Sequence, residues 1–310
     1  MRRTLARAIH FSGRGLHSGK QADLAVHPAP AGHGIAFRRL DLDGAAPIPA
    51  LWKHVVPGAL NTRISLGGDN EVWTIEHLMA ALAGFGVTDA LVTLDGPEVP
   101  ILDGSARPFV EGILAAGLQD LPGELQVIEI LSPVEVREGA AFARLSPALA
   151  PHMWFAIDFP DAAIGRQSRG LAMANGAVVE ELADSRTFCR LADIERMREE
   201  GLALGGTYEN AVVVDGARVL SPGGLRHADE AVRHKMLDAV GDLATAGAPV
   251  IGLYQGHRAG HMLTNRLLRA LFARPETYRL RPASPEIAAH LPGTGMAAGD
   301  GAALRPRRVA

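Results

Sequence analysis

The segment from residue 230 to 246 constrains the fold most, because it has two periodic faces along one predicted helix. One face is apolar and suits a core; it consists of Val232, Met236, Val240 and Leu243. The other face is polar and consists of Glu230, His234, Asp238, Gly241 and Asp242. Glycine inside a helix costs about 1 kcal/mol relative to alanine, so Gly241 indicates close packing. A surface helix with a polar outer face is the alternative.

The spacing of His234 and Asp238 is that of two metal ligands on one helix. Residues four apart share a helical face, so this imidazole and this carboxylate can point at one ion. His77, on a second predicted helix, would complete a two-histidine, one-carboxylate set with an open coordination position. Glu76 lies beside His77 and is suited to act as a general base on water. Together these residues predict a metal-dependent hydrolase.

His261 stands at the start of a further predicted helix, over residues 261–272. A helix N-terminus disfavours an imidazolium, whereas a nearby carboxylate such as Asp242 would favour it. The functional interpretation is a charged general acid or oxyanion partner that works with Glu76 as the base. The alternative is a surface histidine at a helix terminus.

The order of the remaining elements predicts an α+β fold with two similar domains. In the first half we expect a helix over 70–86, with Thr74 as its cap and Gly84 and Gly86 at its end. The other predicted elements of this half are strands at 21–26, 34–38 and 87–94 and a helix at 108–118. Those of the second half are strands at 126–130, 141–145, 153–159 and 250–254 and the helices at 230–246 and 261–272. Each half is a sheet followed by helices, so two layers should face each other as a sandwich.

The turn-forming stretch around residues 118–124 predicts the domain boundary. The first domain would span 1–120 and the second 125–285, with a βαβ-type insertion at about 187–215. That insertion combines a charged helix at 191–201 with a strand at 211–214. Residues 286–310, rich in proline, glycine and alanine and ending in a basic run, are expected to form a loose tail.

Composition excludes several classes of protein. A net charge of −3 gives no reason to expect a nucleic-acid partner. Cys189 is the only cysteine, so no intrachain disulfide can form and a reducing compartment is expected. No signal-peptide pattern and no apolar run of about 20 residues is present. We therefore expect a cytoplasmic protein without a transmembrane segment. A monomer that acts on a small molecule is a separate expectation that does not follow from composition.

Ordered motifs from Gly13 to His261 resemble one family, the zinc-dependent UDP-3-O-acyl-N-acetylglucosamine deacetylases of lipid A biosynthesis. The matching segments are Gly13–Gly19, Thr74–Leu78, Pro100–Ser105, Asp184–Phe188, Gly224–Arg226, Val232–Asp238, Gly241–Leu243 and Gly260–His261. The resemblance implies hydrolysis of an N-acetyl group on an acylated UDP-sugar, which releases acetate in the committed step of that pathway. After about Ala273 no match is evident.

The resemblance also implies a role for each residue that matches the motifs. His77, His234 and Asp238 would be the zinc ligands, with iron(II) a possible replacement. Glu76 would be the base, His261 the acid that protonates the leaving amine, Asp242 its orienting partner and Thr187 the donor to the oxyanion. Phe188 and the insertion would wall the acyl passage. Lys235, His17 and Arg258 would face the sugar-nucleotide part of the substrate.

One departure from the family and two competing functions need separate tests. Cys189-Arg190 follows Phe188 where the family often has a glycine and an aromatic residue, which puts the shape of the acyl passage in doubt. The same ligand set suits iron(II) oxygenases, but Glu76 and His261 would then have no evident task. A binding module with a structural metal would usually need a closed, cysteine-rich cage.

Overall fold

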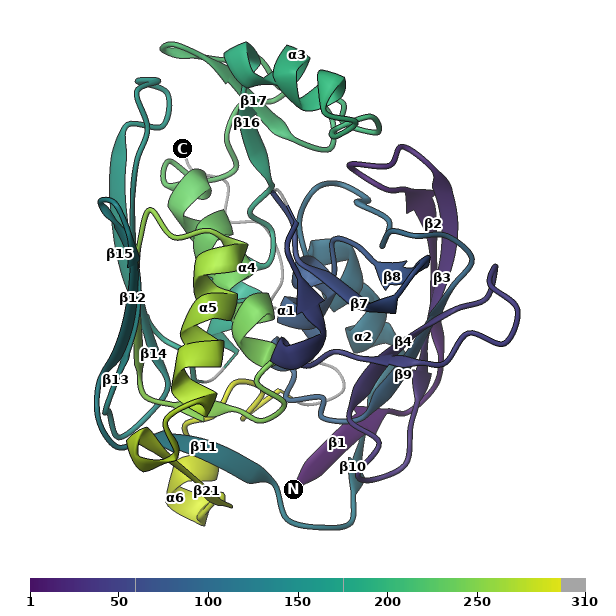
Figure 1. Cartoon of the computed structure of the whole chain (residues 1–310), viewed down its shortest axis with the longest axis vertical. Helices are drawn as coiled ribbons and strands as arrows, with labels where there is room; N and C mark the ends of the chain where they lie inside the picture. The colour runs from purple at the N-terminus through teal and green to yellow at the C-terminus, as the bar shows by residue number, and fades with distance from the viewer. Residues whose placement is uncertain (59, 175, 297–310) are drawn as a thin grey trace.

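The protein is described by a computed structural model that places residues 1–58, 60–174 and 176–296. Two five-stranded sheets form the outer layers, and the helices α1, α4 and α5 lie between them (Figure 1). This is the α+β sandwich predicted from the order of the elements. No helix in the described part of the chain combines the length and the apolar character that a membrane span requires.

The first sheet has the strand order β2-β3-β9-β4-β5, with only β9 and β4 parallel. Its strands are β2 (Ile9–Arg14), β3 (Gln21–Pro28), β4 (Ile35–Arg39), β5 (Ile48–Pro49) and β9 (Ala90–Leu94). Alternation along β3 and β9 buries every second side chain, and Val26 and Val92 are fully buried. The helices of this half are α1 (Glu76–Gly84) and α2 (Arg107–Ala116).

The second sheet repeats this arrangement with the strand order β12-β13-β20-β14-β15, in which only β20 and β14 are parallel. Its strands are β12 (Val134–Glu138), β13 (Ala141–Ser146), β14 (His152–Asp158), β15 (Arg166–Ala172) and β20 (Leu253–His257). Its helices are α4 (Glu230–Ala244) and α5 (His261–Phe272). Both halves run through four strands, a helix, the central strand and a second helix. The two units are therefore similar, as predicted, and we retain the domain boundary around residues 118–124 as a proposal.

The insertion in the second half is a βαβ unit, as expected. It consists of β16 (Phe188–Arg190), α3 (Leu191–Glu199) and β17 (Val212–Asp215), with β18 (Arg218–Val219) alongside. Strands β16 and β17 pair in parallel, and the unit extends from one end of the sandwich (Figure 1). A π-helical turn, η2 (Val178–Leu182), precedes it.

Smaller elements close the two ends. The first half also contains η1 (Trp52–His54), β6 (Val55–Val56), β7 (Arg63–Gly67) and β8 (Asn70–Val72). Two small sheets complete the fold. One pairs β1 (Arg2–Leu5) with β10 (Leu118–Leu121), and the other pairs β11 (Gln126–Ile130) with β19 (Val250–Ile251) and β21 (Tyr278–Pro282). The last elements are η3 (Pro275–Thr277) and α6 (Pro285–Ala288).

Three local predictions are wrong. Helix α1 begins at Glu76, not near residue 70, and Thr74 is no cap, because its φ of 58° takes it out of the helix and its hydroxyl bonds to Glu98. The strand expected at 250–254 is broken at Gly252, where a side chain would collide with the Ser146 carbonyl oxygen. The tail is not loose over residues 286–296, since Ile287 and Leu291 are buried; residues 297–310 lie outside the described residues.

Candidate active site

Helices α1 and α4 pack directly against each other in the middle of the sandwich. A Cβ on Gly241 would lie 2.0 Å from the carbonyl oxygen of Glu76, so only glycine permits this approach. The polar face of α4 therefore points at α1 and not at solvent, while Val232 and Met236 are fully buried on the other side. The surface-helix alternative is excluded by this burial on both faces.

The contact between the two helices brings His77, His234 and Asp238 together. The Asp238 Oδ1 atom lies 3.6 Å from His77 Nε2 and 3.3 Å from His234 Nε2. Ligand atoms at zinc-bond lengths in a tetrahedron are separated by about 3.3–3.5 Å. This Oδ1 atom is buried and has no hydrogen-bond partner among the described residues. A cation between the three side chains would satisfy it, and within the described ranges these are the only three such ligands that cluster.

The second ring nitrogen of His234 is held by the backbone. Its Nδ1–H donates to the carbonyl oxygen of Ser185 at 3.0 Å, which leaves Nε2 as the free lone pair that faces Asp238. Burial lowers the pKa of His234 to about 4, although Asp238 opposes this shift. His234 is therefore neutral at neutral pH, the protonation state that a metal ligand needs.

The other oxygen of Asp238 is paired with Lys235. The Lys235 ammonium donates to Asp238 Oδ2 at 2.7 Å. Burial opposes ionisation of Asp238, yet the neighbouring His234 and Lys235 hold its pKa well below the usual range. Burial likewise disfavours the Lys235 cation, but the Asp238 carboxylate raises its pKa above the ordinary value. Both groups stay charged as a pair.

Glu76 and His261 flank this cluster. His261 Nε2 lies 3.8 Å from Glu76 Oε1 and 3.8 Å from Asp238 Oδ2, while its Nδ1–H faces the Asp242 oxygens at 3.1 and 3.2 Å. Burial would lower the pKa of His261, but Asp242 and Glu76 raise it to about 9. Burial also raises the pKa of Glu76. One proton acceptor and one protonated donor thus stand side by side.

A cavity of about 1010 Å³ opens from this cluster toward the insertion. Thr187 and Phe188 line its inner part, and the Phe188 ring lies edge-on to His234 with centroids 6.2 Å apart. The main-chain groups of Thr187 pair with Gly104 and Val212, so the side chain is presented from a fixed backbone. The apolar residues that the insertion contributes to the lining are Leu191, Ile194, Met197, Ala203, Ala211 and Val213.

His17 and Arg258 line the same cavity but differ in how they are held. Burial lowers the pKa of His17 to about 4, and its Nε2 atom has no hydrogen-bond partner among the described residues. Arg258 is more exposed and donates to Asp158 at 2.5 Å. A neutral imidazole, whose Nδ1 accepts the Ala203 N–H and whose Nε2 has no partner among the described residues, and a paired cation therefore border the same space.

The sequence did not predict two residues that form hydrogen bonds to the candidate site residues. Thr62 contacts both Glu76 and Asp242, and Ser185 acts through its main chain. No local pattern marks Thr62, because its partners are 14 and 180 residues away. Glu230, on the polar face of α4, forms a buried ion pair with Arg186 instead of joining the metal cluster.

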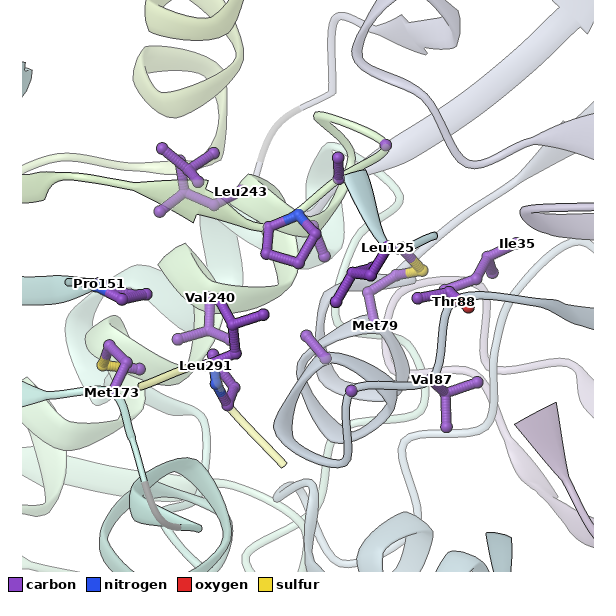
Figure 2. A pocket seen from close by; sticks show the side chains of 18 of the residues that line it. Ile35, Met79, Val87, Thr88, Leu125, Pro151, Met173, Val240, Leu243 and Leu291 are labelled. Carbon is purple, nitrogen blue, oxygen red and sulfur yellow. The ribbon is translucent and has the colours of Figure 1, made fainter. Parts of the chain in front are cut away.

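A second cavity, of about 240 Å³, lies between the two halves and contacts the apolar sides of α1 and α4. Met79 and Leu125 from one side and Val240 and Leu243 from the other surround it (Figure 2). The candidate ligands His77, His234 and Asp238 do not line this cavity, and neither do Glu76 and His261. These candidate catalytic residues therefore line the larger of these two cavities and not the smaller one.

Comparison with known proteins gives one consistent result. The family described as LpxC, UDP-3-O-acyl N-acetylglycosamine deacetylase, matches residues 2–273. A UDP-3-O-acyl-N-acetylglucosamine deacetylase of Phenylobacterium zucineum is 48% identical over 279 residues, covering 90% of this chain and 95% of its own. Enzymes of the same name from Acidithiobacillus ferrooxidans and Myxococcus xanthus are 45% and 44% identical, covering 89% and 91% of this chain and 91% and 89% of their own. The chain belongs to the UDP-3-O-acyl-N-acetylglucosamine deacetylase family.

Proposed function

We propose that this protein removes the N-acetyl group of UDP-3-O-(3-hydroxyacyl)-N-acetylglucosamine, giving the free amine and acetate, the committed step of lipid A biosynthesis. The family and the names of the relatives support the reaction. The observation that carries the proposal within this chain is the buried, unpartnered Asp238 oxygen between two imidazole nitrogens, next to a carboxylate and a charged histidine.

His77, His234 and Asp238 would hold a divalent ion, which we propose to be zinc, with iron(II) as the possible replacement. Two neutral imidazoles and one carboxylate with an open position are the donor set of a catalytic site and not of a closed structural cage. When bound, such an ion acts as a Lewis acid on the amide carbonyl and lowers the pKa of water to about 7. The spacing of the three donor atoms supports this assignment.

Glu76 would take the proton from the attacking water, and His261 would give a proton to the amide nitrogen as it leaves. The raised pKa of Glu76 favours proton uptake, and the His261 cation has a proton to donate near neutral pH. Asp242 would keep His261 oriented through Nδ1. An amide nitrogen is a poor leaving group without protonation, so the reaction needs both the base and the acid.

Thr187 would donate to the oxyanion of the tetrahedral intermediate, a stabilisation that commonly dominates the lowering of the barrier. Phe188 and the apolar side chains of the insertion would contact the acyl chain, while Lys235, His17 and Arg258 would bind the sugar-nucleotide part. All of these residues line one cavity, and the insertion contributes both apolar and charged side chains to it.

The decisive experiment is to incubate the purified protein with the acylated UDP-N-acetylglucosamine and to measure acetate. Acetate release that a chelator abolishes and added zinc restores is the expected result. UDP-N-acetylglucosamine without the acyl chain serves as the matched control substrate and should react far more slowly. Absence of acetate from the zinc-loaded protein would overturn the proposal, and turnover that depends on 2-oxoglutarate and dioxygen would identify an oxygenase instead.

We further propose that the protein is a cytoplasmic monomer. A sugar-nucleotide substrate supports the cytoplasmic assignment. Sedimentation of the zinc-loaded protein at the mass of one chain, and recovery of the activity in the cytosolic fraction, are the expected results. A stable dimer in solution, or activity only in the membrane fraction, would contradict these two assignments.

A further inference from the structure

Thr62 is the only residue that contacts both the Glu76 and the Asp242 carboxylates through hydrogen bonds within the described ranges. Its backbone N–H donates to Glu76 Oε2 at 3.0 Å. Its hydroxyl donates to Asp242 Oδ1 at 2.5 Å. The residue is buried, with 3% of its surface exposed, so water does not compete for these two bonds.

The segment that carries Thr62 is fixed from both sides. Asn61 donates from its amide to the Thr74 hydroxyl at 2.9 Å. The Arg63 guanidinium lies 3.8 Å from the centre of the Trp73 ring and donates to the Asn61 side chain. Thr62 also accepts the Ile75 N–H at its own carbonyl oxygen, one residue before α1 begins. Its two donors are therefore held in place before any substrate binds.

Each of the two carboxylates contacts Thr62 and also faces His261. Glu76 is held at Oε2 by Thr62, and its Oε1 atom faces His261 Nε2 at 3.8 Å. Asp242 takes the Thr62 hydroxyl at Oδ1, and both of its oxygens face His261 Nδ1. Rotation of either carboxylate would break its bond to Thr62, so Thr62 restricts the orientation of both.

We propose that Thr62 is a positioning residue that fixes the base Glu76 and, through the Asp242 carboxylate, the acid His261 relative to each other. This inference rests on the proposed function, because it takes the roles of Glu76 and His261 from it. The hydroxyl acts on His261 through Asp242 and touches no reacting atom. Its loss should therefore slow the chemical step and leave substrate and metal binding unchanged.

The test compares Thr62→Val, which removes the hydroxyl at nearly constant volume, with Thr62→Ser, which keeps it. A hydrogen bond to a charged buried group contributes enough for the valine variant to lose about tenfold or more in kcat. KM and zinc content should stay at their original values, and the serine variant should keep most of kcat. Thr62→Ala tests the same hydroxyl without steric demand and replaces the valine variant if that protein does not fold.

Two further variants separate positioning from general loss of structure. Thr4→Val removes another buried threonine hydroxyl, one that accepts the Ala29 N–H away from the catalytic cluster, and should lower Tm without lowering kcat. In the double variant Thr62→Val with Asp242→Asn, the loss of kcat should be clearly smaller than the sum of the two single effects, because both act on one contact.

Wild-type kcat in the valine and alanine variants would overturn the inference, and so would equal losses in the serine and valine variants. Full additivity in the double variant would also overturn it. Glu76→Ala and His261→Ala are assayed beside these proteins. If those two keep their activity, the proposed function itself fails; if they lose it while Thr62→Val does not, only the role of Thr62 fails.

Discussion

The two ends of the polar face of α4 hold carboxylates in opposite ways. Glu230, in the first turn, accepts four hydrogen bonds from Arg186 and from the Arg226 backbone. Asp238, two turns later, accepts the Lys235 ammonium at one oxygen and has no hydrogen-bond partner for the other within the described residues. Both side chains are almost completely buried.

This difference separates a structural carboxylate from one that is available for a ligand. A buried ion pair is tolerated when every donor and acceptor is satisfied. A buried oxygen without a partner costs stability, and a ligand that bonds to it would recover that cost. The same helix face and the same type of side chain thus give two different roles, and only the neighbouring residues decide which.

The largest effect is expected for Asp238→Asn. The variant should lose zinc and all measurable deacetylase activity, because one of three ligands is replaced by a neutral amide. The metal-free variant should also lose stability, because the Lys235 ammonium loses its charged partner at Oδ2, although Oδ1 makes no hydrogen bond to lose. Metal analysis and urea unfolding of the metal-free proteins test both parts. A fully zinc-loaded, active variant would show that Asp238 is not a ligand and does not differ in this respect from Glu230.

Glu230→Ala should lower stability without removing the metal, because Glu230 is not one of the three candidate ligands. Removal of one partner of a buried ion pair leaves the Arg186 cation uncompensated and should cost about 3–5 kcal/mol of unfolding free energy. Glu138→Ala, which breaks an exposed pair with Arg266, is the control and should cost about 1 kcal/mol or less. Urea unfolding measures both variants, and equal small losses would show that the Glu230 end is not structural.

Glu76→Ala and His261→Ala should each lower kcat about a hundredfold or more with zinc still bound. Neither side chain belongs to the cluster of three donors, so metal content should match the wild type. Steady-state kinetics combined with metal analysis tests this. Near-normal turnover in either variant would exclude the acid and base roles, and loss of zinc would place that residue among the ligands.

The smallest effect is a shift of the pH profile in Asp242→Asn. Burial lowers the pKa of His261, and the Asp242 carboxylate is the first of the groups that raise it to about 9. His261 must be protonated to act as the acid, so activity should be lost as the pH rises through its pKa. Without the Asp242 charge this pKa falls, and the alkaline limb of kcat should move to lower pH. An alkaline limb at the same or a higher pH would contradict the pairing of Asp242 with His261.

The sequence predicts the three candidate metal ligands better than it predicts the residues around them. Spacing four residues apart placed His234 and Asp238 on one face, and Gly241 correctly indicated close packing. The partner of that packing, the Glu76 backbone, has no signature of its own. Thr62 and the Ser185 carbonyl oxygen were missed for the same reason, because contacts between distant segments leave no periodic pattern in the chain.

The fold shows a similar division. Strands with one buried face, such as β9 and β14, were among the predicted elements, and every second side chain along them is buried. The edge strands β12 and β15 were not predicted. The sequence RQSRGLA of β15 shows little contrast between faces, whereas VEVRE in β12 does alternate and was overlooked. The break at Gly252 depends on the approach of the Ser146 backbone. Such contacts are decided by tertiary structure and not by local preference.

The candidate ligands come from two helices on opposite sides of the interface between the similar units. An ion that binds only the assembled arrangement shifts the folding equilibrium toward it by mass action. Occupancy of this site by the ion would thus depend on the docking of the N-terminal and C-terminal units. The apparent melting temperature would rise with the concentration of free zinc. Folding of the whole polypeptide and acquisition of its ion would then be a single linked equilibrium.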